Sequence, residues 1–562
     1  MVYLATDKNA NKFFCSGCNA MWIIVRLCKN QLSHYENKPL FQKNLLRPYH
    51  CLCDMNFKQG ISREQISMMS PEGFIASDNP VRVIDIFVDI LDLVELGFTK
   101  TKLSKEGCPP YQAKVLLKLY YYGYINRIRS SRKLEAECLR NVELWWLIHQ
   151  LTPGYHTIAD FRKDNAAALK KAFKKFVAFL KGEDIVDGKV IAVDGTKLRA
   201  QNNKKNNFNE AKFARSLAYI ETKVEEYISE LDQCDVQEDK QAAELKKKDV
   251  AKKLEELVKR KEHYKKLHDS MIKSGEKQIS MSDPDSRSLP LNNTITAVCF
   301  NVQAVADKKH SLIVDFETIN TTDQGQLLPM VTKAMEALGV AETTVLADKG
   351  YHTGKDLHEC KETHITTVVA YPERSNKNID PAYQTSAFNY NKDQDTYTCP
   401  QGAILTTNGK AYDKVKKGRA TYLVKKYTTD QCLACMLRNL CTKAKSREIE
   451  RSQYQDVVDE NNKRTDENQP LYKIRQQISE HPFGTIKRNW GYTYTLLKGI
   501  KKVNGEMAII FTMYNIRRAM SILGVKRLME RLKQYKCALK ANQTAILKCF
   551  NLYQPVRINI AA

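Results

Sequence analysis

The order of apolar and polar residues divides the chain into a helical first part and a mixed second part. Between residues 55 and 180, apolar residues repeat at three- and four-residue spacing, which is the period of an amphipathic helix. The pattern predicts helices over 81–94, after the start signal Asp78-Asn79-Pro80, and over 111–134. A further helix is predicted to open at a capping box over 157–160. We therefore expect an all-helical N-terminal domain.

Short runs of β-branched residues begin after Gly188. Residues 189–193 predict a buried strand that reaches a turn at Asp194-Gly195, and residues 343–347 predict a strand that ends at Asp348. Other strands are predicted over 295–306, 310–318 and 366–370, and a helix over 327–338. The order strand, strand, strand, helix, strand, helix, strand is that of an RNase H-like mixed sheet. The expected fold class is therefore α/β.

A long helical insertion separates the first predicted strand from the second. Apolar residues alternate four- and three-residue steps from Phe213 to Leu231, and a second ladder steps by seven from Val236 to Met271. Two such helices around a short turn predict an antiparallel coiled-coil hairpin over 207–275. Its many lysines over 246–266 suit a solvated face better than a nucleic-acid contact.

These patterns give a domain map. We expect an irregular extension over 1–54, a helical domain over 55–180 and a core over 181–371 and 469–530. The coiled coil lies inside that core, a Cys-containing insertion covers 372–468, and a tail covers 531–562. The extension holds five cysteines in irregular spacing, so it is either a small zinc knuckle or, as we prefer, translated sequence upstream of a native start at Met55.

The net charge of the chain limits the kinds of partner that we expect. The 562 residues carry a formal net charge of +25, which points to a polyanionic partner, most often nucleic acid. An anionic membrane surface is the rival, but no apolar run reaches the length of a membrane span. The sixteen cysteines are scattered and no signal peptide stands at the start, so we expect reduced thiols in a cytoplasmic protein.

Three acids form the candidate site. Asp194 and Asp348 each end a predicted strand, and Glu480 precedes Lys487 by seven residues, close to two helical turns. Taken singly, each aspartate is ordinary turn chemistry and Glu480 with Lys487 is an ordinary solvated pair. Taken together, three carboxylates could hold two Mg²⁺ or Mn²⁺ ions for phosphoryl transfer. Lys487 and Arg488 would then hold the phosphates of a nucleic-acid strand.

Two further clusters leave alternatives open. A basic cluster follows a run of tyrosines and consists of Arg127, Arg129, Arg132 and Lys133. It is either a solvated face or a set of phosphate contacts. A second cluster comprises Cys399, Cys432, Cys435 and Cys441. It could hold a tetrahedral zinc ion or consist of buried, reduced thiols.

Several segments after Met55 resemble the DDE-type insertion-sequence transposases of bacteria, in the group with a helical N-terminal domain and an RNase H-like catalytic core. The segments are YINRIRSSRKLE (124–135), TIADFRKDN (157–165), VIAVDGTKLRA (190–200), VLADKGYHTG (345–354) and EHPFGTIKR with WG (480–491). The resemblance implies that Asp194, Asp348 and Glu480 are the catalytic metal-binding triad. It also implies a helix signature of Tyr472, Arg475, Glu480 and Lys487, although this chain has four residues between the arginine and the glutamate where the related pattern has three.

The sequence therefore predicts a DNA transposase that binds element ends, cleaves strands with Mg²⁺ or Mn²⁺ and transfers them. Its partners would be double-stranded DNA, both inverted repeats and target, and a second copy of the chain. The residues expected to contact DNA are Arg127, Arg129, Arg132, Lys133, Lys197, Tyr472, Arg475 and Arg488. The alternatives are a nuclease of the same fold, a DNA-binding repressor and an inactive remnant.

Overall fold

The computed structural model describes residues 64, 70–99, 101, 109–234, 240–291, 294–372, 379–415 and 421–552. By its internal contacts the chain divides into the units Met1–Met68 and Met69–Ala562, and the second unit is described below. The prediction for 1–54 and the start at Met55 lie outside the described residues.

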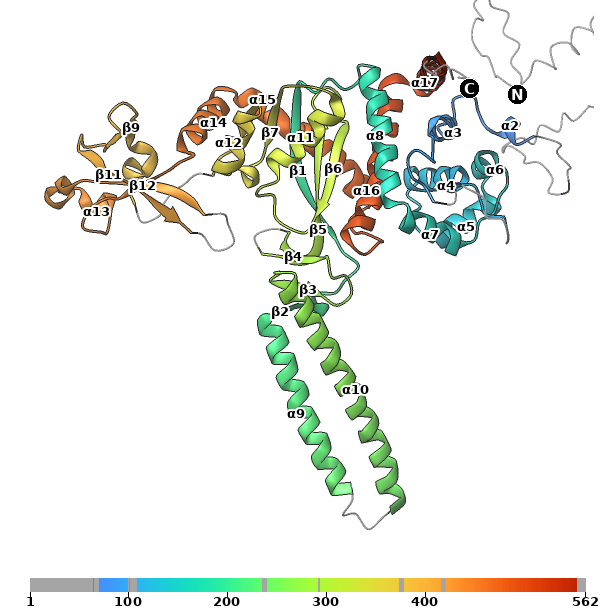
Figure 1. The fold of residues 1–562 in the computed structure, drawn as a ribbon, viewed down its shortest axis with the longest axis horizontal. Helices are drawn as coiled ribbons and strands as arrows, with labels where there is room; N and C mark the ends of the chain where they lie inside the picture. The colour runs from blue at the N-terminus through green and yellow to red at the C-terminus, as the bar shows by residue number, and fades with distance from the viewer. Residues whose placement is uncertain are drawn as a thin grey trace, which may run out of the picture. The chain divides into compact units, whose positions relative to one another are not determined.

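The N-terminal part is helical, as predicted (Figure 1). Three of its expected boundaries are wrong, and the first is that of the helix predicted over 81–94, which ends at Ile90. The helix predicted over 111–134 breaks in two after Ile125, where Arg127 takes a left-handed conformation with φ 64° and the Ile128 amide donates to the Gly123 carbonyl. The helix predicted to open at the 157–160 capping box begins instead at Tyr155, after Gly154. The helices are α2 (Pro71–Phe74), α3 (Val81–Ile90), α4 (Ala113–Ile125), α5 (Ser131–Arg140), α6 (Val142–Ile148), α7 (Tyr155–Asp164) and α8 (Ala166–Gly182).

A mixed sheet forms the centre of the described unit. Its strands are β1 (Val190–Arg199), β4 (Arg287–Pro290), β5 (Thr296–Asp307), β6 (Ile313–Ile319), β7 (Thr343–Ala347) and β8 (Ile365–Val369). The order is β4-β5-β1-β7-β8, with β6 also paired to β5. Strand β5 runs antiparallel to β1 and β6, whereas β7 and β8 run parallel to β1. The strands predicted from β-branched runs are therefore present.

The predicted turn at Asp194-Gly195 is wrong. Strand β1 continues through both residues, which pair with Ala304 and Gln303 of β5. Gly195 is required by space and not by a turn, because a Cβ there would lie 2.4 Å from Gln303 Nε2 and 2.5 Å from Asp323 Oδ1.

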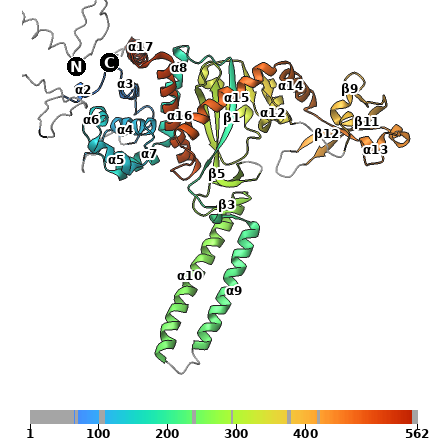
Figure 2. The ribbon, with the colours of Figure 1, turned by 180° about the vertical axis from the view of Figure 1, so that it is seen from behind.

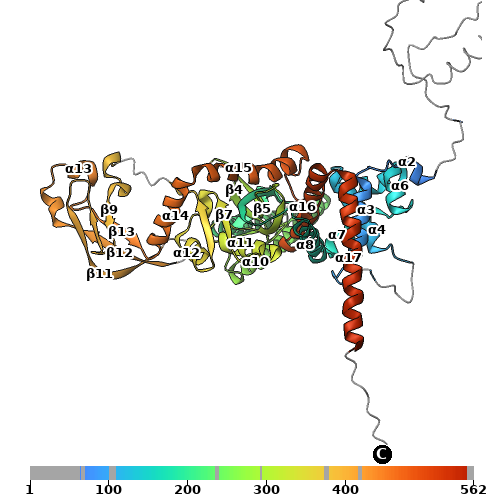
Figure 3. The same cartoon turned by 90° about the horizontal axis from the view of Figure 1, so that it is seen from above.

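Helices cover both faces of this sheet. Figure 3 shows α15 (Gln469–Gly484) on one face and α11 (Leu327–Leu338) on the other, and both helices contact β1, β5 and β7. Helix α16 (Ile500–Leu523) lies against β6, α8 and α4. It approaches α8 so closely that a Cβ at Gly505 would stand 2.5 Å from Ala166 Cα. One cluster of buried residues therefore runs from Ile75 through the sheet to Leu532, and the N-terminal helices share the core of the sheet.

Five further helical elements belong to the part of the chain that contains the mixed sheet. They are η2 (Lys349–Tyr351), α12 (Gly354–Glu362), α14 (Gln455–Glu467), the π-helix η6 (Thr485–Asn489) and α17 (Val525–Leu552). Helix α14 falls within the predicted 372–468 insertion, yet it lies against α12 and β8. The Asn461 side chain of α14 accepts the Val369 amide at 3.1 Å.

The predicted coiled-coil hairpin is present as α9 (Glu210–Cys234) and α10 (Lys240–Lys273), which run side by side in Figures 1 and 2. Its base is closed by η1 (Lys204–Asn206) and by β2 (Asn207–Asn209), which pairs with β3 (Gln278–Ser280). The apolar ladders meet in a separate small core formed by Phe208, Phe213, Ile220, Tyr264, Met271 and Ile279.

The Cys-containing segment forms a second sheet. Its order is β13-β12-β11-β10-β9, and each neighbouring pair of these strands is antiparallel. The elements are η3 (Pro381–Tyr383), η4 (Thr385–Ala387), β9 (Asn389–Asn391), β10 (Thr396–Thr398), β11 (Ile404–Lys414), β12 (Tyr422–Thr428), η5 (Asp430–Ala434), α13 (Arg438–Cys441) and β13 (Ile449–Ser452).

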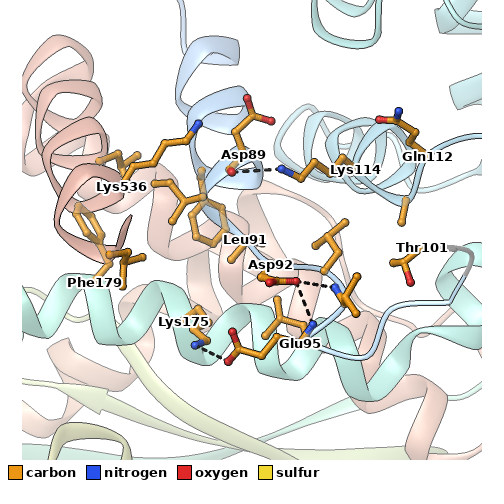
Figure 4. Close-up of a pocket in the computed structure, with 18 of the residues that line it drawn as sticks. Asp89, Leu91, Asp92, Glu95, Thr101, Gln112, Lys114, Lys175, Phe179 and Lys536 are labelled. Atoms are coloured by element: carbon orange, nitrogen blue, oxygen red, sulfur yellow. Dashed lines mark hydrogen bonds and ion pairs between the residues drawn. The ribbon is translucent and has the colours of Figure 1, made fainter. Parts of the chain in front are cut away.

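A cavity of about 700 Å³ opens among α3, α4, α8 and α17. Figure 4 shows its polar rim, where Lys175 pairs with Glu95 at 3.1 Å and Asp92 accepts two backbone amides. None of the residues that line it is a predicted site residue. We therefore locate the candidate site from the acids and not from this cavity.

Candidate functional site

Asp194 and Asp348 come together at the edge of the sheet. The register of the parallel strands β1 and β7 pairs Val193 with Ala347, so Asp194, within β1, and Asp348, just after β7, follow paired residues. The Asp348 carboxylate is close enough to raise the pKa of Asp194 by charge repulsion. Sequence reasoning predicted this juxtaposition from two separate strand ends.

The surroundings of Asp194 disfavour the charged form of its carboxylate, because its pKa is raised. Burial raises its pKa, and the charge of Asp348 adds to that rise. The Arg475 guanidinium, 3.9 Å away, the Gly195 amide at 2.8 Å and the Ser479 hydroxyl all act to lower the pKa. They do not compensate fully, because the pKa remains above its ordinary value. A bound cation would supply the missing compensation.

The face of α15 that meets Asp194 carries Arg475 and Ser479, one helical turn apart. Arg475 Nε is buried and has no hydrogen-bond partner among the described residues. The Arg475 guanidinium also lies 5.6 Å from the centre of the Tyr472 ring. Arg475 thus reaches Asp194 and Tyr472 lies beside Arg475, while their part in a helix signature stays a prediction.

Glu480 lies on the next position of α15 and is exposed to solvent. Its side chain accepts a hydrogen bond from Gln476 at 2.8 Å, and within the described ranges it forms no hydrogen bond or ion pair with Asp194 or Asp348. The expectation that Glu480 and Lys487 occupy one regular helical face is wrong. Pro482 lies inside α15 and the chain continues as the π-helix η6, whose wider turns change the spacing.

Lys487 reaches the strand that carries Asp194. Its Nζ donates to Thr196 Oγ1 at 2.9 Å and to the Lys197 carbonyl at 3.4 Å. Burial lowers the pKa of Lys487, and the nearby charge of Lys197 lowers it further. Lys197 pairs with Asp323, with 3.5 Å between Nζ and Oδ2. Lys487 therefore lies near Asp194, whose charge acts on its pKa, whereas the Lys197 ammonium faces Asp323.

A polar network beneath the aspartates was missed from the sequence. Asn301 Nδ2 and Gln303 Nε2, both on β5, each donate to Asp323 Oδ1 at 2.8 Å. The Tyr351 hydroxyl donates to Gln303 Oε1. Burial raises the pKa of Tyr351, and the charges of Asp323, Asp194 and Asp348 also raise it. The available signal was the pair of polar residues inside the otherwise apolar 295–306 strand.

The predicted basic cluster is divided by the structure. Arg127, Arg132, Lys133 and Arg488 are exposed, and Arg127 donates to Asn489 at 2.7 Å. Arg129 is only 7% exposed. Its guanidinium lies over the rings of Tyr492 and Tyr494, at 4.4 and 4.6 Å, and pairs with Glu506. The prediction that Arg129 contacts DNA is therefore corrected, because this arginine is used to hold the fold together.

Cys399, Cys432, Cys435 and Cys441 line one small cavity of the second sheet. The amides of Gln401 and Ala403 donate to Cys399 Sγ at 3.3 and 3.2 Å. Burial raises the pKa of Cys441, and the other three thiols act on it in the same direction. As the side chains stand, no group of three or more His, Cys, Asp or Glu in the described part of the chain could hold a metal ion. Both predicted metal sites thus remain predictions.

Two family models match the chain. A transposase DDE domain matches residues 398–520, which include Glu480 and Lys487. A transposase domain known as DUF772 matches residues 69–164, which span α2 to α7. These matches identify a DDE-type transposase. As a DNA transposase, the chain is an enzyme that binds and cleaves DNA.

The other comparisons add little to that identification. No curated protein matches the sequence. A solved piggyBac transposase synaptic complex with hairpin DNA aligns at 8% identity and a TM-score of 0.27, over 86% of this chain and 83% of the other. A score this low carries no argument about the transposase described here. In the described part of this transposase, no helix has the length and apolar character needed to cross a membrane.

Proposed function

We propose that this transposase cleaves and transfers DNA strands at the ends of its element, using Asp194, Asp348 and Glu480 as metal-binding acids. The observation that carries the proposal is that Asp194 and Asp348 directly follow Val193 and Ala347, which pair with each other in the parallel strands β1 and β7. Two carboxylates at one sheet edge, in a chain with transposase domains, suit metal-dependent phosphoryl transfer.

We further propose that the core is RNase H-like. The path β6-β5-β1-β7-β8, with the first three strands antiparallel and the last two parallel to β1, supports this assignment. The order of the path's elements along the chain, which is β1, β5 and β6 before α11 and then β7, α12 and β8, supports it as well.

The residues present fit Mg²⁺ or Mn²⁺. Carboxylate oxygens are the hard ligands that these ions prefer, and the raised pKa of Asp194 shows that its charge is under-compensated. When bound, two such ions would activate the attacking water or 3′-hydroxyl and stabilise the leaving oxygen. To serve as the third ligand, Glu480 would have to turn from its hydrogen bond with Gln476 toward Asp194.

The cations of the site would hold the DNA backbone. Arg475 has a buried Nε without a partner among the described residues, so it can donate to a phosphate oxygen. Lys487 lies against β1, where its Nζ donates to Thr196 Oγ1 and to the Lys197 carbonyl. The exposed residues Arg127, Arg132, Lys133 and Arg488 would add sequence-independent contacts to element ends and target. Because transposition acts on two ends, we propose at least a homodimer on DNA.

Replacing Glu480 by glutamine tests the third acid. We expect Glu480→Gln to reduce Mg²⁺-dependent cleavage of a labelled element-end duplex by about a hundredfold or more, because a neutral amide is a poor ligand. Binding of the same duplex should not change. Glu467→Gln is the matched control, since Glu467 is an exposed glutamate paired only loosely with Lys463, at 3.9 Å, and it should cleave normally.

The same assay separates the alternatives. Wild-type cleavage without any joined product would favour a nuclease, and binding without cleavage would favour a repressor or an inactive copy. If Glu480→Gln cleaves as fast as Glu467→Gln, Glu480 is not a metal ligand, and the proposed triad fails even though the transposase is active.

A structural zinc ion is the second metal proposal. The shared cavity of the four cysteines and the amides aimed at Cys399 Sγ support it, because thiolate ligands attract such donors. We expect about one zinc per chain by elemental analysis of the purified protein. Zinc should be lost in Cys432→Ser and kept in Cys537→Ser, which changes an exposed cysteine outside the cluster. Equal zinc in both variants would place the ion elsewhere, and none in the wild type would leave four reduced thiols.

A further inference from the structure

A fourth carboxylate, Asp323, lies at the candidate site. It belongs to the loop between β6 and α11, and its side chain is 23% exposed. Its two oxygens have different partners. Oδ1 accepts hydrogen bonds from Asn301 and Gln303, whereas Oδ2 faces Lys197.

Asp323 lies against the backbone next to both aspartates of the site. A Cβ built on Gly195 would stand 2.5 Å from Asp323 Oδ1, and one built on Gly350 would stand 3.4 Å from Oδ2. Gly195 follows Asp194 directly, and Gly350 is two residues after Asp348. Each glycine thus leaves space that the Asp323 carboxylate occupies.

Hydrogen bonds from strand β5 connect Asp323 to the segment that follows Asp348. Asn301 and Gln303 are fully buried residues of β5, the strand that pairs with β1 on either side of Asp194. Gln303 also accepts the Tyr351 hydroxyl from the segment that follows Asp348. Asp323 Oδ1 therefore accepts from two side chains of β5, and one of them, Gln303, also accepts from the segment that follows Asp348. Asp323 Oδ2 faces Lys197 of β1.

We propose that Asp323 is a positioning residue that fixes the separation of Asp194 and Asp348, through the two amides that its Oδ1 accepts. This inference rests on the proposed function, in which the two aspartates hold divalent cations. It assigns Asp323 no contact with the reacting atoms. Its consequence is measurable, because a carboxylate pair held at the wrong separation binds a cation more weakly.

The test is a titration of the full-length protein with Mn²⁺. The amount of unbound Mn²⁺ is measured by electron paramagnetic resonance. We expect Asp323→Ala to weaken Mn²⁺ binding at least about tenfold and to raise the metal concentration for half-maximal cleavage by the same factor. Asp323→Asn keeps an oxygen that can accept both amides, so it should bind within about threefold of the wild type. Asp285→Ala is the control, because Asp285 is an exposed loop acid that accepts the Ile500 amide.

Thermal unfolding of every variant shows whether it folds. If Asp323→Ala does not fold, Gln303→Glu tests the same inference. That change keeps an acceptor for Tyr351 but removes the donor to Asp323, so it should also weaken Mn²⁺ binding about tenfold. The inference is overturned if a folded Asp323→Ala or Gln303→Glu binds Mn²⁺ like Asp285→Ala, or if Asp323→Asn is as defective as Asp323→Ala. A wild type that binds no Mn²⁺ would instead overturn the proposed function.

Discussion

Asp348→Asn is expected to lower Mg²⁺-dependent cleavage of element ends by about a thousandfold or more, equivalent to about 4 kcal/mol of transition-state stabilisation. The substitution keeps the size of the side chain and can still accept the Lys349 amide, which donates to Asp348 Oδ1 at 2.6 Å. It removes one of two negative charges at the sheet edge, so a divalent cation loses a ligand. End binding should remain, because it depends on basic side chains elsewhere.

Two measurements make this result interpretable. Gel-shift binding to the same duplex shows whether the variant still recognises DNA, and Asp413→Asn, on the exposed part of β11, controls for the loss of a surface carboxylate. Cleavage by Asp348→Asn at the rate of Asp413→Asn would remove Asp348 from the catalytic site.

The second large effect is on stability. Arg129→Met is expected to lower the free energy of unfolding by about 3–5 kcal/mol, because it leaves the Glu506 carboxylate buried without its cation. Glu506 is 1% exposed, and its remaining partners are the amides of Leu496 and Leu497, at 2.9 and 3.1 Å. The variant also loses a hydrogen bond to the Tyr494 carbonyl and stacking on two tyrosine rings.

Arg132→Met is the matched control, since Arg132 is an exposed arginine over a single ring, Tyr155, at 5.0 Å. Denaturant unfolding followed by circular dichroism should give a clearly lower midpoint for Arg129→Met than for Arg132→Met. Equal midpoints would mean that the buried pair does not join the N-terminal helices to the rest of the core.

The contrast between these two arginines shows what the sequence could not reveal. Both lie in one basic cluster, and the local pattern treats them alike. The partner that buries Arg129 is Glu506, 377 residues away, so only the tertiary structure separates a core cation from a surface one. The same holds for Gly195, whose Asp-Gly pair predicts a turn until Gln303 and Asp323 are seen to occupy the space of a side chain.

The strands that precede Asp194 and Asp348 were more predictable from the sequence than the environments of Arg129 and Gly195. Buried strands are marked by short β-branched runs, and an aspartate directly follows each of the runs 189–193 and 343–347. That the two strands are parallel neighbours, which places Asp194 beside Asp348, is seen only in the structure. The helix that carries Glu480 was less predictable from the sequence. A proline within α15 and a π-helix after it shift the side-chain positions that a regular helical count assigns.

The central claim is that Asp194 binds a catalytic metal ion, and exchange of the ligand atom tests it most directly. Asp194→Cys replaces a hard oxygen by a softer sulfur, which favours Mn²⁺ over Mg²⁺. The account predicts that this variant binds element ends, fails to cleave them in Mg²⁺ and recovers cleavage when Mn²⁺ is supplied, while Asp194→Ala fails in both metals. Cleavage by Asp194→Cys in Mg²⁺ at the wild-type rate would contradict the account.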